Sequence, residues 1–231
     1  IFDKIRKYYR SLQTMNVVMY YWLTMTVLTM FWECSFVYQY KSINAFSQEL
    51  IDTNTHVWTN EYGWEYMLPW KTAFIFYGEY GAYADREYMV SANDWSRVIE
   101  SSHAMFCGVG AVLVLYQKIQ KRYYITNTKN YYLALGTSMG SQLMNSVLYM
   151  ANYFVQIQDK YNINYCSREF PCRFALTARA FMYVNVFWTV MPSYAIVYTW
   201  NNRNKILPRF LSETENAQCP TQAWRPISQD E

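Results

Sequence analysis

The sequence predicts an all-α, polytopic membrane protein, a bundle of four transmembrane helices that encloses an apolar cavity. Of its 231 residues, 16% are charged, 52% are hydrophobic and 20% are aromatic. A soluble domain usually has about 25% charged residues. The charges also leave long uncharged gaps, with basic residues gathered in the N-terminal segment, between the second and third gaps and after the fourth gap, and acidic residues gathered between the first two gaps. These three observations favour a membrane bundle over a soluble domain.

The uncharged gaps predict where the helices cross the membrane. No Asp, Glu, Lys or Arg occurs at 11–32, 101–117, 130–158 or 180–202. Each gap approaches or exceeds the roughly 20 residues that a helix needs to span a bilayer. With the helix ends included, we expect spans at about 12–38, 93–117, 130–158 and 175–200. They form one domain at 1–202, followed by a polar tail at 203–231, and a long segment with short interfacial helices joins the first two spans.

The distribution of charge predicts the orientation of the bundle. Basic residues gather in the N-terminal lead-in, between the second and third spans and at the start of the tail, whereas segment 39–92 is acidic. With four spans, the basic segments all lie on one side, as the positive-inside rule expects. Both termini are therefore expected on the cytoplasmic or matrix side. We expect the endoplasmic reticulum membrane, with the mitochondrial inner membrane as the alternative.

Cysteine and motif content narrows the chemistry. Cys166 and Cys172 flank the loop CSREFPC on the non-cytoplasmic side. The sequence allows either a disulfide between them or two free thiols. The chain has no zinc-type Cys/His spacing, no phosphate loop and no nucleophile elbow. We therefore expect no metal, no cofactor and no nucleic-acid partner.

The stretch Asn93–Tyr116 carries the strongest functional signal. It places Glu100 and His103 three residues apart, so both side chains share one helix face. An ionisable pair in an apolar span usually faces the bundle interior or a water-filled cavity. The alternative is an ordinary amphipathic helix whose wet face carries the pair.

The first and third spans offer further polar groups at helical spacing. Thr29 and Glu33 lie four residues apart, hence on one face of the first span. Glu33 is close to the helix end, so an interfacial position and a cavity position are both open. Gln142 and Tyr149 share a face of the third span. They either line the cavity or form hydrogen bonds between helices.

Two motifs concern packing and the fourth span. Gly136 and Gly140 form a GxxxG, a pattern that permits close helix approach in lipid. Asn185 and Trp188 lie three residues apart in the fourth span. If all these faces converge, the cavity holds two carboxyls, an imidazole and an indole.

Such a cavity suits acid–base chemistry on an alkene. Burial favours the protonated form of a carboxyl, which can then act as a general acid near neutral pH. Aromatic walls stabilise a cation through their ring quadrupoles. Protonation of an alkene, with loss of a proton from a neighbouring carbon, is the reaction that these groups would support.

Four segments of the chain resemble a known family. The loop EYGAYADREY is similar to a KEY…DSRY pattern, VIESSHA to MExxTA, SQLMNSVLY to GQxxGDVLY, and NVFWTVMP to NALWLVLP. Through these segments, the chain resembles the EXPERA-domain family over about Leu28–Trp200, in particular its emopamil-binding-protein branch of sterol isomerases. The last segment is the most specific, because its Asn, Trp and Pro all fall in register.

The resemblance implies roles for individual residues. Glu33 and Glu100 match the family's two catalytic glutamates, and Asn185 and Trp188 match its substrate-pocket Asn and Trp. The chain departs from the family at two positions. Thr29 stands where the family has its catalytic His, and His103 stands where the family has a Thr one turn beyond the second catalytic Glu. We expect these two positions to face each other across the pocket, so that one imidazole still lies beside two carboxyls.

Three functions are consistent with the sequence. The first is a membrane isomerase or cyclase for a sterol or other terpenoid, with catalytic residues Glu100, His103 and Glu33 and with substrate contacts at Asn185, Trp188, Thr29, Gln142, Tyr149 and Trp95. The second is a lipid- or amphiphile-binding protein of the same fold without turnover. The third is an accessory, lipid-holding subunit of a larger membrane complex, for example in mitochondria. A sterol, terpenoid or other lipid and the bilayer are the expected partners, and a homodimer and a larger complex are both open.

Overall fold

The computed structural model describes residues 16–90, 95–119, 126–172, 179 and 182–217. This part of the chain is all-α, as predicted, with five α-helices and no strand. The α-helices are α2 (Val17–Thr53), α3 (Pro69–Tyr83), α4 (Ser101–Ile119), α5 (Thr126–Gln156) and α6 (Tyr183–Ala217). Short 3-10 turns η1 (Val57–Thr59), η2 (Trp64–Met67) and η3 (Arg86–Met89) flank α3, and the π-helical turn η4 (Trp95–Glu100) leads into α4.

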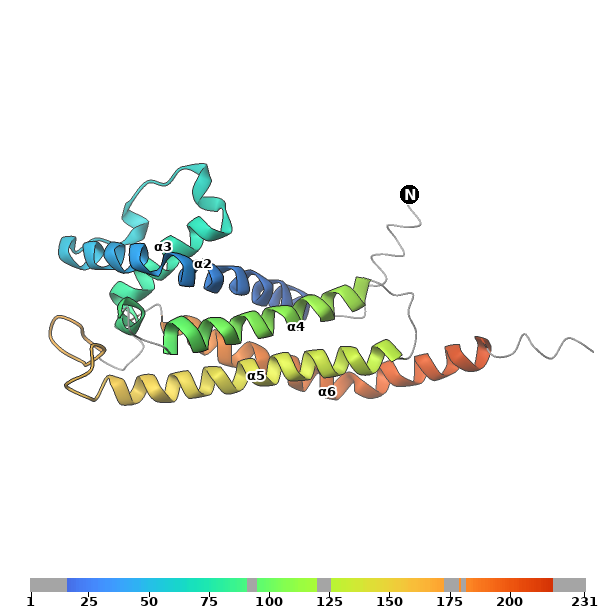
Figure 1. Ribbon diagram of the computed structural model, residues 1–231. Coiled ribbons are helices and arrows are strands. Elements are labelled where there is room, and N and C mark those ends of the chain that lie inside the picture. The colour runs from blue at the N-terminus through green and yellow to red at the C-terminus, as the bar shows by residue number, and fades with distance from the viewer. Residues whose placement is uncertain (1–15, 91–94, 120–125, 173–178, 180–181, 218–231) are drawn as a thin grey trace, which may run out of the picture.

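Four long helices lie side by side, and α3 lies with the C-terminal half of α2 at one end of them (Figure 1). Helix α2 packs against α3 and α4, α4 packs against α5, and α5 packs against α6. The ring of Trp22 on α2 meets Phe187 and Trp188 on α6, at centroid distances of 5.3 and 4.6 Å. These contacts bring the first and last helices together, so the bundle closes around its interior.

Helix α2 is longer than the first predicted span. It begins after Asn16, whose side chain accepts a hydrogen bond from the Val18 amide at 2.9 Å, and ends at Asn54 in the left-handed conformation with φ 49°. The sequence predicts an end near residue 38, yet residues 39–53 contain no Gly or Pro to break the helix. Ile43 and Leu50 in this extension are buried against the region of α3, so tertiary packing extends the helix.

Helix α6 also differs from the predicted span. The structure carries it beyond Trp200, through the start of the predicted polar tail, to Ala217. The predicted start of the fourth span falls partly outside the described residues, as do the basic N-terminal lead-in and the first residues of the second span.

The GxxxG on α5 makes no close helix contact within the described part of the chain. A side chain added at Gly136 or Gly140 would meet no described atom within 4 Å, so neither glycine lies at a close helix contact. The close approaches occur on α4 instead, where a Cβ on Gly108 would lie 2.4 Å from Met30 and one on Gly110 would lie 2.8 Å from Ser138. The short motif is common, and only the rotation of each helix decides which small residues meet a neighbour.

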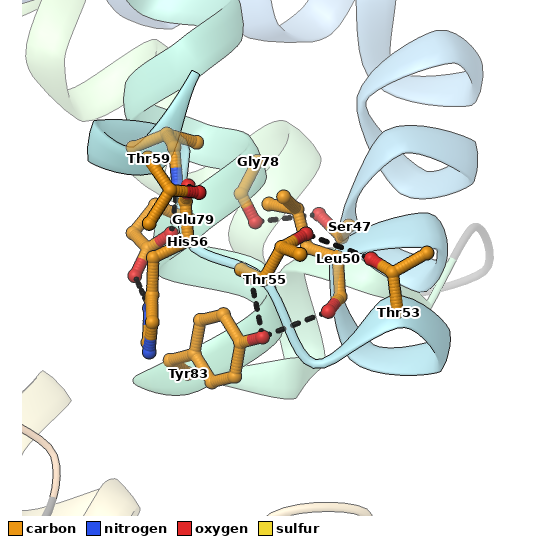
Figure 2. Close-up of polar contacts among 10 residues, drawn as sticks. Ser47, Leu50, Thr53, Thr55, His56, Thr59, Gly78, Glu79 and Tyr83 are labelled. Atoms are coloured by element: carbon orange, nitrogen blue, oxygen red, sulfur yellow. Dashed lines mark hydrogen bonds and ion pairs between the residues drawn. The ribbon is translucent and has the colours of Figure 1, made fainter.

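A buried carboxylate holds the corner between α2 and α3 (Figure 2). Glu79 is fully buried; its Oε1 lies 2.6 Å from His56 Nδ1, and its Oε2 accepts the Val57 amide at 3.0 Å. The hydroxyl of Tyr83 donates to the carbonyls of Leu50 and Thr55, at 2.8 and 2.6 Å. These bonds tie the segment after α2 to α3, and the Leu50 carbonyl also accepts a hydrogen bond from the Thr55 amide at 3.0 Å.

Replacing Glu79 with alanine is expected to lower the free energy of unfolding by about 1–3 kcal/mol, because a buried amide and an imidazole lose their acceptor. Thermal unfolding of the purified protein measures the effect. The matched control is Glu49→Ala, since Glu49 is exposed on α2, the helix that packs against α3. Equal melting temperatures for the two variants would show that the corner does not depend on this carboxylate.

The connection from α5 to α6 is held by a disulfide and a buried arginine. Cys166 and Cys172 form a disulfide across a Cα–Cα distance of 5.3 Å, which settles the alternative that the sequence leaves open. Arg179 is 1% exposed and donates to the carbonyls of Asn164 and Phe170, each at 3.0 Å. Its guanidinium also lies 3.4 Å from the ring centroid of Phe170. Arg179 therefore organises the loop from inside.

One helical segment in the described part of the chain, Arg97–Gln117, is long and apolar enough to cross a membrane, judged by length and composition alone. It lies within the second predicted span.

Candidate functional site

A cavity of about 500 Å³ lies among α2, α3, α4, α5 and α6. Eight of the nine predicted site residues line it, namely Thr29, Glu33, Glu100, His103, Gln142, Tyr149, Asn185 and Trp188. The side chain of the ninth, Trp95, lies outside the described part of the structure. The polar faces of the first, second, third and fourth predicted spans therefore converge.

Glu33 lies in the cavity wall, 6% exposed, and not at a helix end. The sequence leaves this position open, and the length of α2 decides it, because the helix runs on for twenty residues past Glu33 to Thr53. The carboxylate accepts a hydrogen bond from the Tyr77 hydroxyl and a second from Ser101 Oγ at 3.2 Å. Three helices thus hold one carboxylate.

Glu100 and His103 enter the cavity from the start of α4. Glu100 is the last residue of the π-helical turn, a type of helix that occurs often at functional sites. Its two carboxylate oxygens each lie 3.2 Å from Asn145 Nδ2 on α5. His103 Nε2 lies 3.2 Å from the sulfur of Cys107, one turn further along α4. The i, i+3 spacing therefore brings both ionisable groups to one cavity, as their shared face predicts.

The remaining predicted residues line the cavity with their polar groups already bonded. The Thr29 hydroxyl donates to its own helix, at 3.0 Å from the Met25 carbonyl. Gln142 Oε1 accepts from Trp22 Nε1 at 3.2 Å, so it both lines the cavity and links α5 to α2. Asn185 Nδ2 donates to the Tyr80 hydroxyl at 2.8 Å. The two roles that the sequence leaves open for the third span, lining and interhelical bonding, coexist at Gln142.

Aromatic residues from α3 and η3, which no sequence pattern singles out, complete the site. Tyr77, Tyr80 and Tyr88 line the cavity. Burial and the neighbouring Glu33 charge raise the pKa of Tyr77 well above its ordinary value, so Tyr77 stays a neutral hydrogen-bond donor to Glu33. The i, i+3 spacing of Tyr77 and Tyr80 is a usable signal, but it is obscured among twenty-four tyrosines.

The chemistry of the lining is apolar and acidic. Trp32, Phe76, Phe187 and Trp188 supply aromatic surface, while the carboxylates are those of Glu33 and Glu100. No Lys or Arg is among the described lining residues. Within the described residues, no group of three His, Cys, Asp or Glu side chains is placed to hold a metal ion. The arrangement can bind a largely apolar molecule, move protons at its carboxyls and stabilise positive charge.

Comparison with known proteins gives no match: no family model, no curated protein and no solved structure matches this chain.

Proposed function

We propose that the chain is a membrane-embedded isomerase, or cyclase, that protonates an alkene in a sterol or other terpenoid and removes a proton from a neighbouring carbon. The observation that carries this proposal is the convergence of Glu33, Glu100 and His103 on one apolar, aromatic-walled cavity. General acid and base groups placed on a bound substrate typically supply about 10²–10⁴-fold in rate. No cofactor is needed, because the reaction moves a proton and no electrons are gained or lost.

Each group in the cavity has a role in this chemistry. Glu100 with His103 shuttles the proton that the alkene receives, and Glu33 assists. Proton addition leaves a carbocation, which the face of Trp188 and the carboxylates stabilise. The apolar walls exclude water, which would otherwise capture the cation as an alcohol. Loss of a proton from the adjacent carbon then forms the new double bond.

The outer surface of the helices supports a membrane location. Large apolar side chains are exposed on every long helix, for example Phe31, Val109, Leu133 and Val197, which are between 52% and 69% exposed. In the Arg97–Gln117 segment only 28% of the most apolar stretch is buried inside the protein, whereas a core helix of a soluble protein is mostly buried. Exposed apolar surface of this extent fits lipid. We place the bundle in the endoplasmic reticulum membrane, with the mitochondrial inner membrane as the alternative, and the resemblance to the EXPERA-domain family is part of the same proposal.

A second candidate is a binding protein for a lipid or cationic amphiphile without turnover, alone or as a lipid-holding subunit of a larger complex. The observation that favours it is the state of the first helix, where the position that the family resemblance assigns to a catalytic His carries Thr29. Its hydroxyl is bonded to the Met25 carbonyl. Acidic, aromatic lining binds a cation whether or not a proton moves.

The deciding experiment incubates the purified protein with a panel of sterols and of linear and cyclic terpenoids in deuterated water, with the products read by mass spectrometry. We expect deuterium in a rearranged product with the wild type and its loss in both Glu100→Gln and His103→Ala. A wild type that incorporates no deuterium from any substrate, and still co-purifies with a lipid, would favour the binding protein.

A further inference from the structure

A chain of hydrogen bonds leaves the cavity at Tyr80 and ends on a carboxylate that the cavity does not touch. Tyr80 lines the cavity from α3, and its hydroxyl lies 2.7 Å from the hydroxyl of Tyr149 on α5. The Tyr149 hydroxyl donates in turn to Asp85 Oδ2. Asp85 is 2% exposed and is not among the lining residues, so it reaches the cavity through Tyr149, which also lines the cavity, and reaches Tyr80 by way of the Tyr149 hydroxyl.

The far end of this series of hydrogen bonds holds the carboxyl group of Asp85. Asp85 Oδ1 accepts from Asn164 Nδ2 at 2.6 Å and from the Glu87 amide at 3.0 Å, in addition to the Tyr149 hydroxyl on Oδ2. Three donors on one carboxyl favour its ionised form. Burial acts in the opposite direction and raises the pKa of Asp85 above its ordinary value. Asp85 therefore takes up a proton more readily than an exposed aspartate would.

Tyr80, at the cavity end of this series of hydrogen bonds, is placed to pass a proton on and not to keep a charge. Burial, followed by the Asp85 charge, raises the pKa of Tyr80 well above its ordinary value, so the neutral phenol is strongly preferred. Asn185 Nδ2 holds the Tyr80 oxygen in place at 2.8 Å. A phenol in this state can accept one proton only as it releases another.

We propose that Tyr80 is a further catalytic residue, which takes the proton from the substrate carbon and passes its own through Tyr149 to Asp85. This inference rests on the proposed isomerase function and names the exit path for the second proton of that reaction. Glu33 and Tyr77 form a separate carboxyl–phenol pair in the same cavity. Tyr77 lies three residues before Tyr80 on α3.

The proton balance of the step is complete. The C–H bond next to the carbocation breaks, its electron pair forms the new double bond, and its proton goes to the Tyr80 oxygen. The Tyr80 hydroxyl proton moves to Tyr149, and the Tyr149 hydroxyl proton moves to Asp85. The substrate cation and the Asp85 carboxylate become a neutral alkene and a neutral carboxylic acid, and both phenols end as they began.

The test separates protonation of the substrate from the deprotonation that completes the reaction. The full-length protein is given an active terpenoid from the panel in deuterated water. Two species are then measured by mass spectrometry, rearranged product and recovered substrate that carries deuterium. The variants are Tyr80→Phe, Tyr149→Phe and Asp85→Asn. The matched control is Tyr83→Phe, which removes a hydroxyl from the same helix, where that hydroxyl bonds the Leu50 and Thr55 carbonyls.

We expect each relay variant to lower the ratio of product to deuterated substrate by at least about tenfold, because the cation is still formed but returns to starting material. The control is expected to keep the wild-type ratio. A parallel fall of both species, or an unchanged ratio, would overturn the relay and leave the isomerase standing. A wild type that yields neither species from any substrate would overturn the isomerase and the relay together.

Discussion

Replacing Glu33 with glutamine is expected to lower the rate of terpenoid isomerisation by about 10²–10⁴-fold, while the protein stays folded. Glutamine keeps the size of the side chain, and its amide oxygen can still accept the hydrogen bond of the Tyr77 hydroxyl. Its amide nitrogen takes the place of the oxygen that Ser101 Oγ bonds, and the Ser101 hydroxyl can rotate to accept from that nitrogen. Glutamine can neither give up nor accept a proton at its amide oxygen during the reaction. The rate is measured on the active substrate under single-turnover conditions, so that chemistry is separated from product release.

The matched control for this prediction is Glu49→Gln, an identical exchange at an exposed position of the same helix. It is expected to leave the rate unchanged. If Glu33→Gln retained full activity while Glu100→Gln lost it, Glu33 would be a structural acceptor for Tyr77 and not part of the proton transfer. Equal binding of a non-reactive amphiphile by the wild type and Glu33→Gln would show that the cavity itself is intact.

The largest effect on stability is expected at Arg179. Alanine in its place should lower the free energy of unfolding by about 3–5 kcal/mol, because three backbone carbonyls and the Tyr153 hydroxyl lose a donor, each worth about 1–3 kcal/mol when buried. The Phe170 ring would also lose the guanidinium stacked on it. Chemical or thermal unfolding of the oxidised protein measures the loss.

Arg168→Ala is the matched control for Arg179, since Arg168 is exposed between the two disulfide-bonded cysteines. Its expected effect is within about 0.5 kcal/mol, as for most surface substitutions. We also expect Arg179→Ala to expose the Cys166–Cys172 disulfide to reduction by a mild thiol. If the two arginine variants unfolded alike, the loop would owe its position to the disulfide alone.

Local sequence periodicity determined a large part of this architecture. Charge gaps predict long helices, and the structure has them. The spacing of Glu100 and His103 places both on one face, and they line one cavity for that reason. Gln142 and Tyr149 follow the same rule on α5. Periodicity succeeds here because it depends only on 3.6 residues per turn.

Only the tertiary structure decided which faces meet. Tyr77 bonds Glu33 across 44 residues of sequence, and Tyr149 bonds Asp85 across 64. Neither pairing follows from helical spacing, because each depends on how two helices are rotated and shifted against one another. The same freedom explains why the glycines of the GxxxG on α5 meet no neighbour while Gly108 and Gly110 on α4 do. The helical period determines which side chains share a face, whereas the packing of the whole bundle determines which residues that face touches.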